Sequence, residues 1–392
     1  MATFLFVVPP LTGHINPLLP VAEDLAKKGH FVAWAGHTEV VSQHIPASQP
    51  CFPLPSNEST FVDENWHKVR GLESVKFFYE YFCLPMALRC LAPLEKIVDE
   101  LNPDVIFCDH QMIAGALVAR KKEIPWVSSV TTTASILKLL DVIDNWLADK
   151  LADLQKAYGM KQIVERPDFS DYGCVVFSSQ ALIGQDKEYF DAPYHFVGPA
   201  INQRRKPTDF PWEKLEDNKR KILISLGTVN RDRCTRFYDI MIEALKDEDV
   251  QVIMVAPENY EAEIPDNFIV QSRVPQLELL SHVNLVVSHA GHNTVCETLS
   301  HAKPLVVSPI RDDQSVIARQ VVDAGAGLSL RFGKVSVAKA KQTIFSVLDD
   351  PSYLLAAARI QRSFEPLQGS KQAALVLESL LDPSQERVYA NG

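Results

Sequence analysis

The chain has 392 residues, and since a single domain usually takes about 100 to 200 residues, we expect two domains. Its residues are 46% hydrophobic and 22% charged, a composition that excludes a disordered, fibrous or collagen-like chain. The 39 basic and 49 acidic residues leave a net charge of -10, and no Lys/Arg block is long enough to follow a nucleic-acid backbone. We therefore expect no nucleic-acid partner.

Seven scattered cysteines without a C-x-x-C pair indicate reduced thiols in a cytoplasmic protein, rather than a disulfide framework or a structural zinc site. The apolar run at residues 1–8 has no basic segment and no small-residue cleavage site, so we interpret it as a strand and not as a signal peptide. No stretch reaches the ~18 consecutive apolar residues of a membrane span, and no transmembrane segment is expected.

Short apolar, β-branched runs alternate with helical patterns along the chain, which is typical of an α/β fold with parallel sheets covered by helices. Asn16 is a candidate N-cap of the first helix, with Pro17 at the first helical position and Gly29 at the end. In the first half we expect strands at 4–8, 31–35, 105–108, 126–129 and 174–178.

The segment 66–101 is helical in pattern and rich in aromatic residues. It predicts an amphipathic helix pair packed on the sheet, and one face of such a pair could also form the wall of an apolar acceptor pocket. The candidate acceptor-binding residues are Phe78, Phe82 and Thr132.

The second half repeats the plan, with strands expected at 222–226, 250–255, 268–271, 284–288, 304–308 and 327–330. Between the halves, residues 203–221 carry two prolines and dense charge with little apolar periodicity, which is typical of a linker. We expect two similar doubly wound α/β domains, at 1–205 and 222–370, joined by a linker at 206–221 and followed by a C-terminal helical segment at 371–392.

Ligands of open doubly wound sheets bind beyond the carboxyl ends of the strands, where the strand order reverses. His14 follows the first strand and Asp109 follows strand 105–108, so both are expected in one crevice. A histidine with a carboxylate behind it is the arrangement of a general base held in one tautomer. The helix expected to begin near Pro17 would place its positive end near His14 and favour the neutral imidazole. The alternative stays open that His14 fills a turn and Asp109 caps the next helix.

The corresponding loops of the second half are Ser225-Leu-Gly-Thr228 and Ser288-His-Ala-Gly-His-Asn-Thr294. A glycine-containing turn before a helix N-terminus offers backbone N–H groups and a positive dipole end, which bind phosphate without a basic surface. Two alternatives remain here. Thr294-x-x-Glu297 matches a capping box, in which Glu297 caps the helix. A metal site at His289, His292 and Cys296 fits no metal template.

Several enzyme classes lack their motifs in this chain. It has no G-x-G-x-x-G after a strand, no G-x-x-x-x-G-K-[ST] and no G-x-S-x-G. These absences argue against a dinucleotide oxidoreductase, a P-loop NTPase and an α/β-hydrolase. The D-x-D form at 247–249 lies at a helix-to-strand turn, at the wrong end of the sheet for a ligand, and is interpreted as solvated charge.

The second half carries an extended motif, formed by RVPQLELL at 273–280, His282, SHAGHNTVCETL at 288–299 and KPLVVSPIRDDQ at 303–314. This motif resembles the donor motif of the GT-B fold, family 1 UDP-glycosyltransferases. The loop Gly13-His14-x-Asn-Pro and the stretch Ser225-Leu-Gly-Thr228 resemble the same family, so the resemblance covers essentially the whole chain.

The resemblance implies two Rossmann-like domains facing a central cleft, with His14 as general base and Asp109 as its partner. It implies that the diphosphate, ribose, base and sugar of the donor are held by Ser225, Gly227, Thr228, Arg273, Val274, Gln276, His289, Gly291, Asn293, Thr294, Glu297, Asp313 and Gln314. Within that set Glu297 would bind the ribose, and Asp313 and Gln314 the sugar. The C-terminal helix at 371–381 would cross back to the first domain.

Two positions depart from the family pattern. Arg273 stands where many members have a tryptophan that stacks on the base, so the guanidinium would stack instead and the choice between uridine and thymidine stays open. His292 stands where a second tryptophan often follows the first glycine of the motif.

These features predict an inverting glycosyltransferase that moves glucose from UDP-glucose to a hydroxyl of an apolar natural product. No metal or other cofactor is expected, because helix dipoles and histidines would stabilise the diphosphate. The alternatives are a TDP-deoxysugar-dependent antibiotic glycosyltransferase, a sugar-nucleotide epimerase of the same fold, and a non-catalytic nucleotide-sugar binding protein. The chain would act as a monomer or a homodimer.

Overall fold

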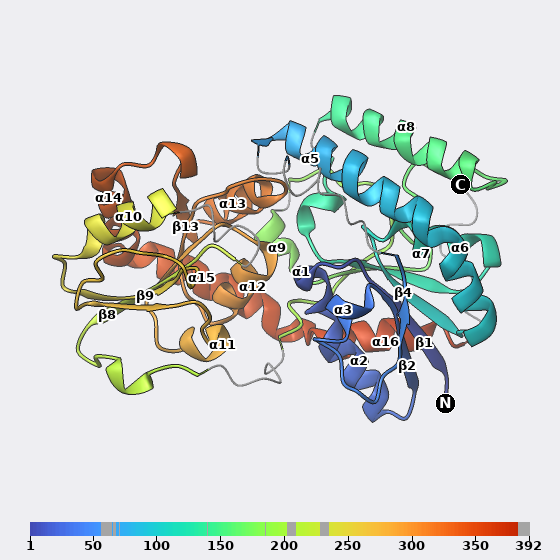
Figure 1. Cartoon of the computed structure of the whole chain (residues 1–392), viewed down its shortest axis with the longest axis horizontal. Coiled ribbons are helices and arrows are strands. Elements are labelled where there is room, and N and C mark those ends of the chain that lie inside the picture. The colour runs from blue at the N-terminus through green and yellow to red at the C-terminus, as the bar shows by residue number, and fades with distance from the viewer. Residues whose placement is uncertain are drawn as a thin grey trace. The chain divides into compact units, whose positions relative to one another are not determined.

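The chain forms two compact units (Figure 1). The computed structural model describes residues 1–55, 65, 68–69, 71–138, 140–184, 186–201, 209–227 and 235–382. The first unit comprises Met1–Ser179, Asp186–Asn202 and Leu367–Gly392, and the second comprises Gln180–Gln185 and Gln203–Pro366. Within the described part of the chain, no helix combines the length and apolarity needed to cross a bilayer.

The described residues of the first unit include a sheet of seven parallel strands, in the order β3-β2-β1-β4-β5-β6-β7. The strand order reverses between β1 and β4, which pair directly. All five predicted strands are confirmed, with ends shifted by one or two residues. The short strands β3 and β7 at the sheet edges were not predicted. The strands are β1 (Thr3–Val7), β2 (Phe31–Gly36), β3 (Cys51–Pro53), β4 (Val105–Asp109), β5 (Trp126–Val130), β6 (Cys174–Val176) and β7 (Tyr194–Phe196).

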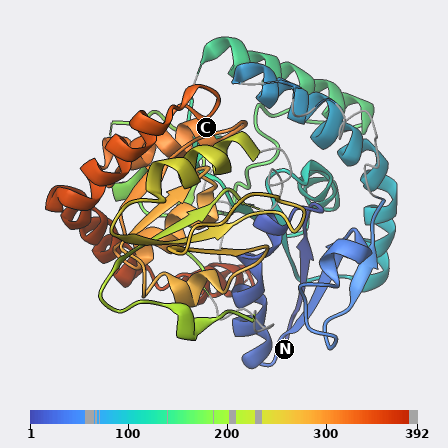
Figure 2. The same ribbon diagram turned by 60° about the vertical axis from the view of Figure 1, so that its left-hand side comes forward.

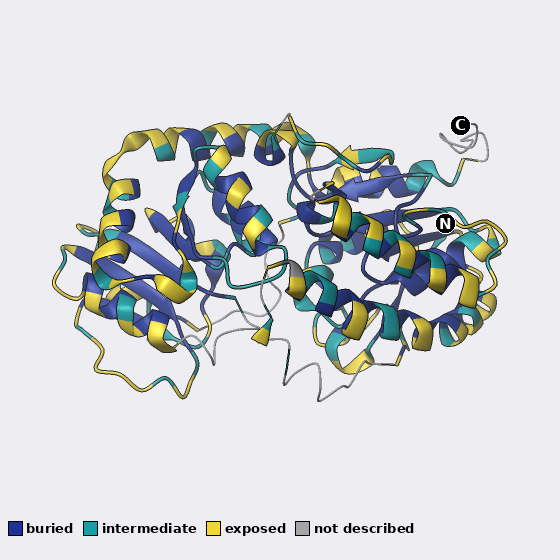
Figure 3. Cartoon of the chain, turned by 90° about the horizontal axis from the view of Figure 1, so that it is seen from above, coloured by how far each residue is buried: buried dark blue, intermediate teal, exposed yellow. Residues whose placement is uncertain are grey.

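Helices cover both faces of this sheet, because successive side chains of a strand point to opposite faces. Phe4 and Phe6 of β1 enter one core, whereas Leu5 and Val7 enter the other. Buried residues lie along the strands and on the inner sides of the helices (Figure 3). The helical segments are α1 (Thr12–Ile15), α2 (Leu18–Lys27), α3 (Thr38–Val41), α5 (Leu72–Phe78), η2 (Tyr79–Cys83), α6 (Leu84–Leu101), α7 (Ile113–Lys122), η3 (Thr133–Ile136), α8 (Asp141–Ala157) and α16 (Ser370–Ser379).

The first helix begins earlier than predicted. Helix α1 starts at Thr12, and Asn16 has helical backbone angles at its C-terminal end instead of the extended conformation of an N-cap. Pro17 precedes α2, and Gly29 ends that helix with a φ of +86°, as predicted. His14 therefore lies inside a helical turn and not in front of one.

The helix pair predicted over 66–101 is instead one helical run, formed by α5, η2 and α6. Proline has no N–H, so Pro85 cannot donate to the carbonyl of Tyr81 four residues earlier, and the π-helical turn η2 lies at this point. Trp66 lies outside the described residues. Helix α8 runs beside this helical run (Figure 2), with Lys76 Nζ 5.4 Å from the centre of the Trp146 ring.

The second unit repeats the arrangement. Its described residues contain six parallel strands in the order β10-β9-β8-β11-β12-β13, so the reversal lies between β8 and β11. All six predicted strands are confirmed. They are β8 (Arg220–Ser225), β9 (Val250–Val255), β10 (Phe268–Gln271), β11 (Leu285–Ser288), β12 (Leu305–Val307) and β13 (Gly327–Ser329).

The second unit also carries helices before, between and after its strands. They are α9 (Gln180–Ile183), η4 (Trp212–Lys214), α10 (Thr235–Leu245), α11 (Gln276–Leu279), α12 (His292–Ser300), α13 (Gln314–Asp323), η6 (Phe332–Lys334), α14 (Val337–Asp349), α15 (Pro351–Phe364) and η7 (Glu365–Leu367), whose last residue is assigned to the first unit.

The predicted domain limits need two corrections. The linker expected at 206–221 is folded into the second unit from residue 209 onward, because the Phe210 side chain is buried in that core and Gln251 bonds the backbone of Lys214 and Glu216. Residues 206–208 lie outside the described range. In addition, Gln180–Gln185 belongs to the second unit, where α9 contacts α13 and α15.

Helix α16 packs on α2 within the first unit. Leu377 is fully buried in the core that contains Phe4 and Phe6. Polar contacts flank it, since Ser370 Oγ donates to Asp24 Oδ2 (2.7 Å) and Lys28 Nζ donates to Glu378 Oε2 (2.5 Å). Helix α16 is thus part of the core of the first unit.

Replacing Leu377 with alanine should destabilise the first unit. Leu377→Ala leaves a cavity and is expected to lower the free energy of unfolding by about 2 to 5 kcal/mol. Leu375→Ala is the matched control on the same helix, because this side chain is 50% exposed. Urea unfolding followed by circular dichroism measures both. Equal midpoints for the two variants would contradict the packing of α16.

Candidate active site

The reversal point of the first sheet brings His14 and Asp109 together, as predicted. His14 Nδ1 lies 2.9 Å from Asp109 Oδ2, although 95 residues separate them. Since an ionised carboxylate only accepts hydrogen bonds, Nδ1 carries the proton and Nε2 carries the lone pair. The alternative role for Asp109 is wrong: helix α7 has Met112 as its N-cap and no side-chain cap, whereas Asp109 is the last residue of β4.

Thr131 completes this pair and was not predicted. Its hydroxyl lies 2.7 Å from His14 Nδ1 and donates to Asp109 Oδ2 at 3.0 Å. The side chain is 4% exposed and follows the end of β5, the strand next to β4. Thr131 therefore fixes the imidazole and the carboxylate relative to each other.

The Asp109 carboxylate is fully buried but remains charged. Burial raises its pKa, while the attraction of His14 and the hydrogen bond from it more than offset this effect, so the pKa lies below its usual range. The backbone N–H of Gln111 also donates to Oδ1 (2.9 Å). A negative charge held behind the imidazole stabilises the imidazolium that forms when Nε2 takes up a proton.

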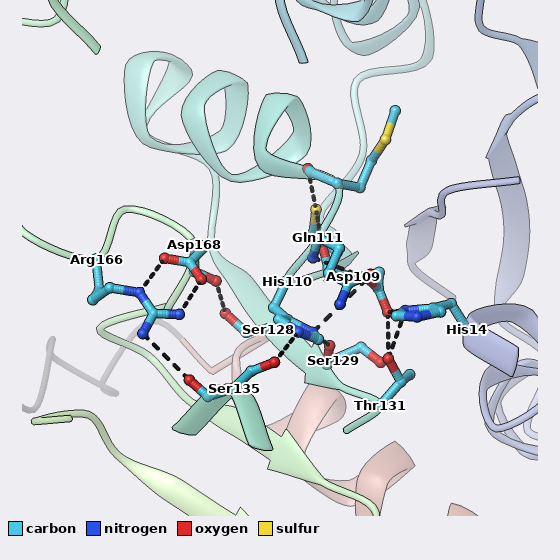
Figure 4. Close-up of polar contacts among 12 residues, drawn as sticks. His14, Asp109, His110, Gln111, Ser128, Ser129, Thr131, Ser135, Arg166 and Asp168 are labelled. Carbon is cyan, nitrogen blue, oxygen red and sulfur yellow. Dashed lines mark hydrogen bonds and ion pairs between the residues drawn. The ribbon is translucent and has the colours of Figure 1, made fainter. Parts of the chain in front are cut away.

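A polar network extends from this pair (Figure 4). His110 donates from Nδ1 to the carbonyl of Ser129 (3.1 Å), and its Nε2 accepts from Ser135 Oγ (2.7 Å). Burial lowers the pKa of His110, which favours the neutral ring. The Ser135 carbonyl in turn accepts from Arg166, whose guanidinium forms a bidentate pair with Asp168 (2.9 and 2.6 Å). These contacts hold the loop that carries Thr131.

The predicted acceptor residues are all buried in the first unit. Phe78 and Phe82 stack with ring centres 5.2 Å apart inside the core formed by α6, α7 and the sheet. Thr132 is 4% exposed and lies beside Thr131. The packing interpretation of the two phenylalanines is thus supported, and their contact with an acceptor stays a prediction.

In the second unit, His289 follows β11 at the reversal point and is enclosed by two glycines. A Cβ on Gly227 would lie 2.7 Å from the His289 ring, and a Cβ on Gly291 would lie 2.5 Å from it. Both positions therefore require glycine to make room for the imidazole. The residue between His289 and Gly291 is Ala290, which has a φ of +65°, a conformation that stores strain at a non-glycine residue.

Helix α12 begins directly after this loop. Its N-cap is Gly291, which has no side chain to cap the helix, and Asn293 and Thr294 lie in the first turn. The capping-box alternative is wrong, because Thr294 is inside the helix and Glu297 instead accepts a bond from Gln276 Nε2 (2.6 Å). Gln276 also accepts from Ser225 Oγ, at 3.4 Å. Three of the predicted donor residues thus form one hydrogen-bonded chain.

The remaining described donor residues lie in the loops at the same edge of the sheet or, for Gln314, at the start of α13. Asp313 is the N-cap residue of α13, and Gln314 Oε1 accepts the backbone N–H groups of Ile310 and Arg311. Val274 is buried, whereas Arg273 is exposed. Thr228 lies outside the described residues.

Burial lowers the pKa of His289 to about 4, and its Nδ1 has no partner among the described residues. In the unfolded chain an imidazole takes up a proton near pH 6.5, whereas in the folded protein His289 stays neutral down to about pH 4. The unfolded state binds more protons in this window, so the free energy of unfolding falls as the pH drops from about 6.5 to about 4.

Removal of the His289 imidazole should therefore flatten this pH dependence. We expect His289→Gln to reduce the slope of unfolding free energy against pH between pH 4 and 6.5, measured by urea unfolding. His282→Gln is the control, because it removes an exposed imidazole from the same unit. A slope that is unchanged in His289→Gln would contradict the burial of a neutral ring.

The chain is similar to known glycosyltransferases over most of its length. The family model "UDP-glucoronosyl and UDP-glucosyl transferase" matches residues 194–368. YojK of Bacillus subtilis (strain 168), described as an uncharacterized UDP-glucosyltransferase, is 29% identical over 98% of this chain and 99% of its own length. The demethyllactenocin mycarosyltransferase of Streptomyces fradiae is 27% identical over 98% of this chain and 87% of its own.

Solved structures show the same fold over almost the whole chain. The glycosyltransferase of kitacinnamycin superposes with a TM-score of 0.81 at 20% identity, covering 97% of this chain and 99% of that one. The calicheamicin glycosyltransferase CalG4 superposes with a TM-score of 0.78 at 21% identity, covering 98% and 100%. The chain thus has the GT-B fold, carries a segment that matches the UDP-glucoronosyl and UDP-glucosyl transferase model, and is a glycosyltransferase.

Proposed function

We propose that this glycosyltransferase moves a hexose from a nucleotide sugar to a hydroxyl of an apolar natural product, with inversion at the anomeric carbon. The observation that carries the proposal is the hydrogen bond between His14 and the buried Asp109. It provides a positioned base at the carboxyl edge of the first sheet, where ligands of this kind of sheet bind.

The proposed step is a single displacement. His14 Nε2 takes the proton of the acceptor hydroxyl as its oxygen attacks the anomeric carbon. The bond from that carbon to the diphosphate oxygen breaks, and the nucleoside diphosphate leaves with the electron pair. Asp109 stabilises the resulting imidazolium, and Thr131 keeps the His14 ring in its orientation toward Asp109. One displacement at the carbon inverts its configuration.

Glucose from UDP-glucose is the proposed donor, supported by relatives named as UDP-glucosyltransferases. A TDP-deoxysugar is the second candidate. It is supported by the similarity to the demethyllactenocin mycarosyltransferase, and Arg273 in place of a base-stacking tryptophan leaves the choice between uridine and thymidine open. Within the proposed site, Gln276 and Glu297 would bind the base and ribose, and Asp313 and Gln314 the sugar.

The acceptor is proposed to be an apolar hydroxylated molecule. Support comes from relatives named as an oleandomycin glycosyltransferase and a zeaxanthin glucosyltransferase.

A cytoplasmic location is also proposed. It is supported by the described cysteines, which are all free thiols.

Loss of the His14 imidazole should stop transfer without stopping donor binding. We expect His14→Ala to lower kcat by about 10²- to 10⁴-fold, the usual contribution of a positioned base. Transfer is measured by mass shift with UDP-glucose, TDP-glucose and a panel of phenols, macrolides and terpenoids, and UDP binding by calorimetry.

His30→Ala is the control for this substitution. His30 belongs to the same unit but precedes β2 at the other edge of the sheet, where it contacts Glu378. The His30→Ala variant should transfer the sugar at close to the wild-type rate. Equal transfer by His14→Ala and wild type would rule out His14 as the base.

We also propose that transfer needs no metal ion, because the N-terminus of α12 and the loop around His289 would stabilise the leaving diphosphate. Full activity is then expected after exhaustive treatment with EDTA, assayed as above in metal-free buffer. Activity that disappears with EDTA and returns with Mg²⁺ or Mn²⁺ would contradict this account.

A further inference from the structure

We propose that Arg311 is the cationic binding residue for the diphosphate of the donor. This inference rests on the proposed function and adds to it a residue outside the donor set that the family resemblance implies. The guanidinium would supply the formal positive charge that the other groups around His289 lack.

Arg311 lies at the same edge of the sheet as His289. Strands β11 and β12 are neighbours, and the backbone N–H of Ser308 donates to the carbonyl of Ser288 (2.7 Å), which fixes the two strand ends side by side. His289 follows Ser288 directly, and Arg311 lies three residues after Ser308. The guanidinium is close enough to His289 to disfavour its protonation.

The Arg311 side chain is only 9% exposed. The other basic residues in the described loops at this edge, Arg273, Arg331 and Lys334, are exposed. A charge that is withdrawn from water interacts more strongly with an anion than an exposed one does. Of these basic groups, Arg311 is therefore the one placed to act on a bound diphosphate.

The rest of the site offers little positive charge. His289 is neutral at pH 7, because burial lowers its pKa to about 4. The N-terminus of α12 contributes about half an elementary charge. The protein as a whole has a net charge of -10 and attracts no anion by its overall field. A local cation would strengthen the binding that these backbone dipoles provide, and the planar fork of an arginine matches phosphate oxygens.

The loop around Arg311 is held in a fixed conformation. Gln314 Oε1 accepts the N–H groups of residues 310 and 311, and Asp312 has a φ of +53°. Arg311 Nε contacts Asp312 Oδ2 at 3.5 Å. This contact and the tightened loop orient the guanidinium before any ligand binds, which reduces the entropy lost on binding.

The test compares UDP with uridine, which lacks the diphosphate, by calorimetry on the full chain. Arg311→Gln should weaken UDP binding about 10- to 100-fold, as expected for a lost charged hydrogen bond, and leave uridine binding unchanged. Arg311→Lys keeps the charge without the fork and should fall in between. Arg311→Gln should also raise the pKa of His289, measured by NMR, because a repelling cation is removed.

Arg319→Gln is the matched control, since it removes the same charge from an exposed site on α13 of the same unit. It should leave UDP affinity within about twofold of wild type, as expected for a surface charge. Unchanged UDP affinity in Arg311→Gln, or an equal loss for UDP and uridine, would overturn the inference alone. A wild-type protein that binds neither UDP nor TDP would overturn the proposed function and this inference with it.

Discussion

The structure depends on the direct parallel pairing of β1 with β4, and of β8 with β11. Both pairs are buried on both faces of their sheets. A shift of one residue would move every side chain of a strand to the opposite face, so the register of these pairs is strongly specified. The pairing brings together strand ends that are far apart in the sequence. His14 meets Asp109 only because Val7 is in register with Cys108, and His289 faces Gly227 because Ser288 is in register with Ser225.

The carboxyl edges of the two sheets hold their buried ionisable side chains in opposite charge states. In the first unit a buried carboxylate stays ionised, because His14, Thr131 and the N–H of Gln111 compensate it. In the second unit a histidine is kept neutral by burial between two glycines. The first arrangement prepares a proton acceptor. In the second arrangement the neutral histidine does not attract an anion. Backbone dipoles and, by our inference, Arg311 attract it instead.

Most of the sheet and the His14–Asp109 pair could be predicted from the sequence, because buried parallel strands are continuous apolar runs and topology places their ends. The edge strands β3 and β7 are only partly buried, so no continuous apolar run marks them in the sequence. Thr131 and the Arg166–Asp168 pair were missed, since their roles depend on side-chain directions in loops. Glu297 matched a capping box by spacing alone, and only the fold shows that Thr294 is inside the helix.

The place of α16 in the first unit has a consequence for synthesis and for dissection of the protein. In topological terms the second unit is inserted between two parts of the first, since residues 367–392 return to it. The whole second unit is therefore synthesised before Leu377 can close the core over Phe4 and Phe6. No single cut separates the two units intact, and a fragment that ends near residue 202 would expose the apolar face that α16 covers.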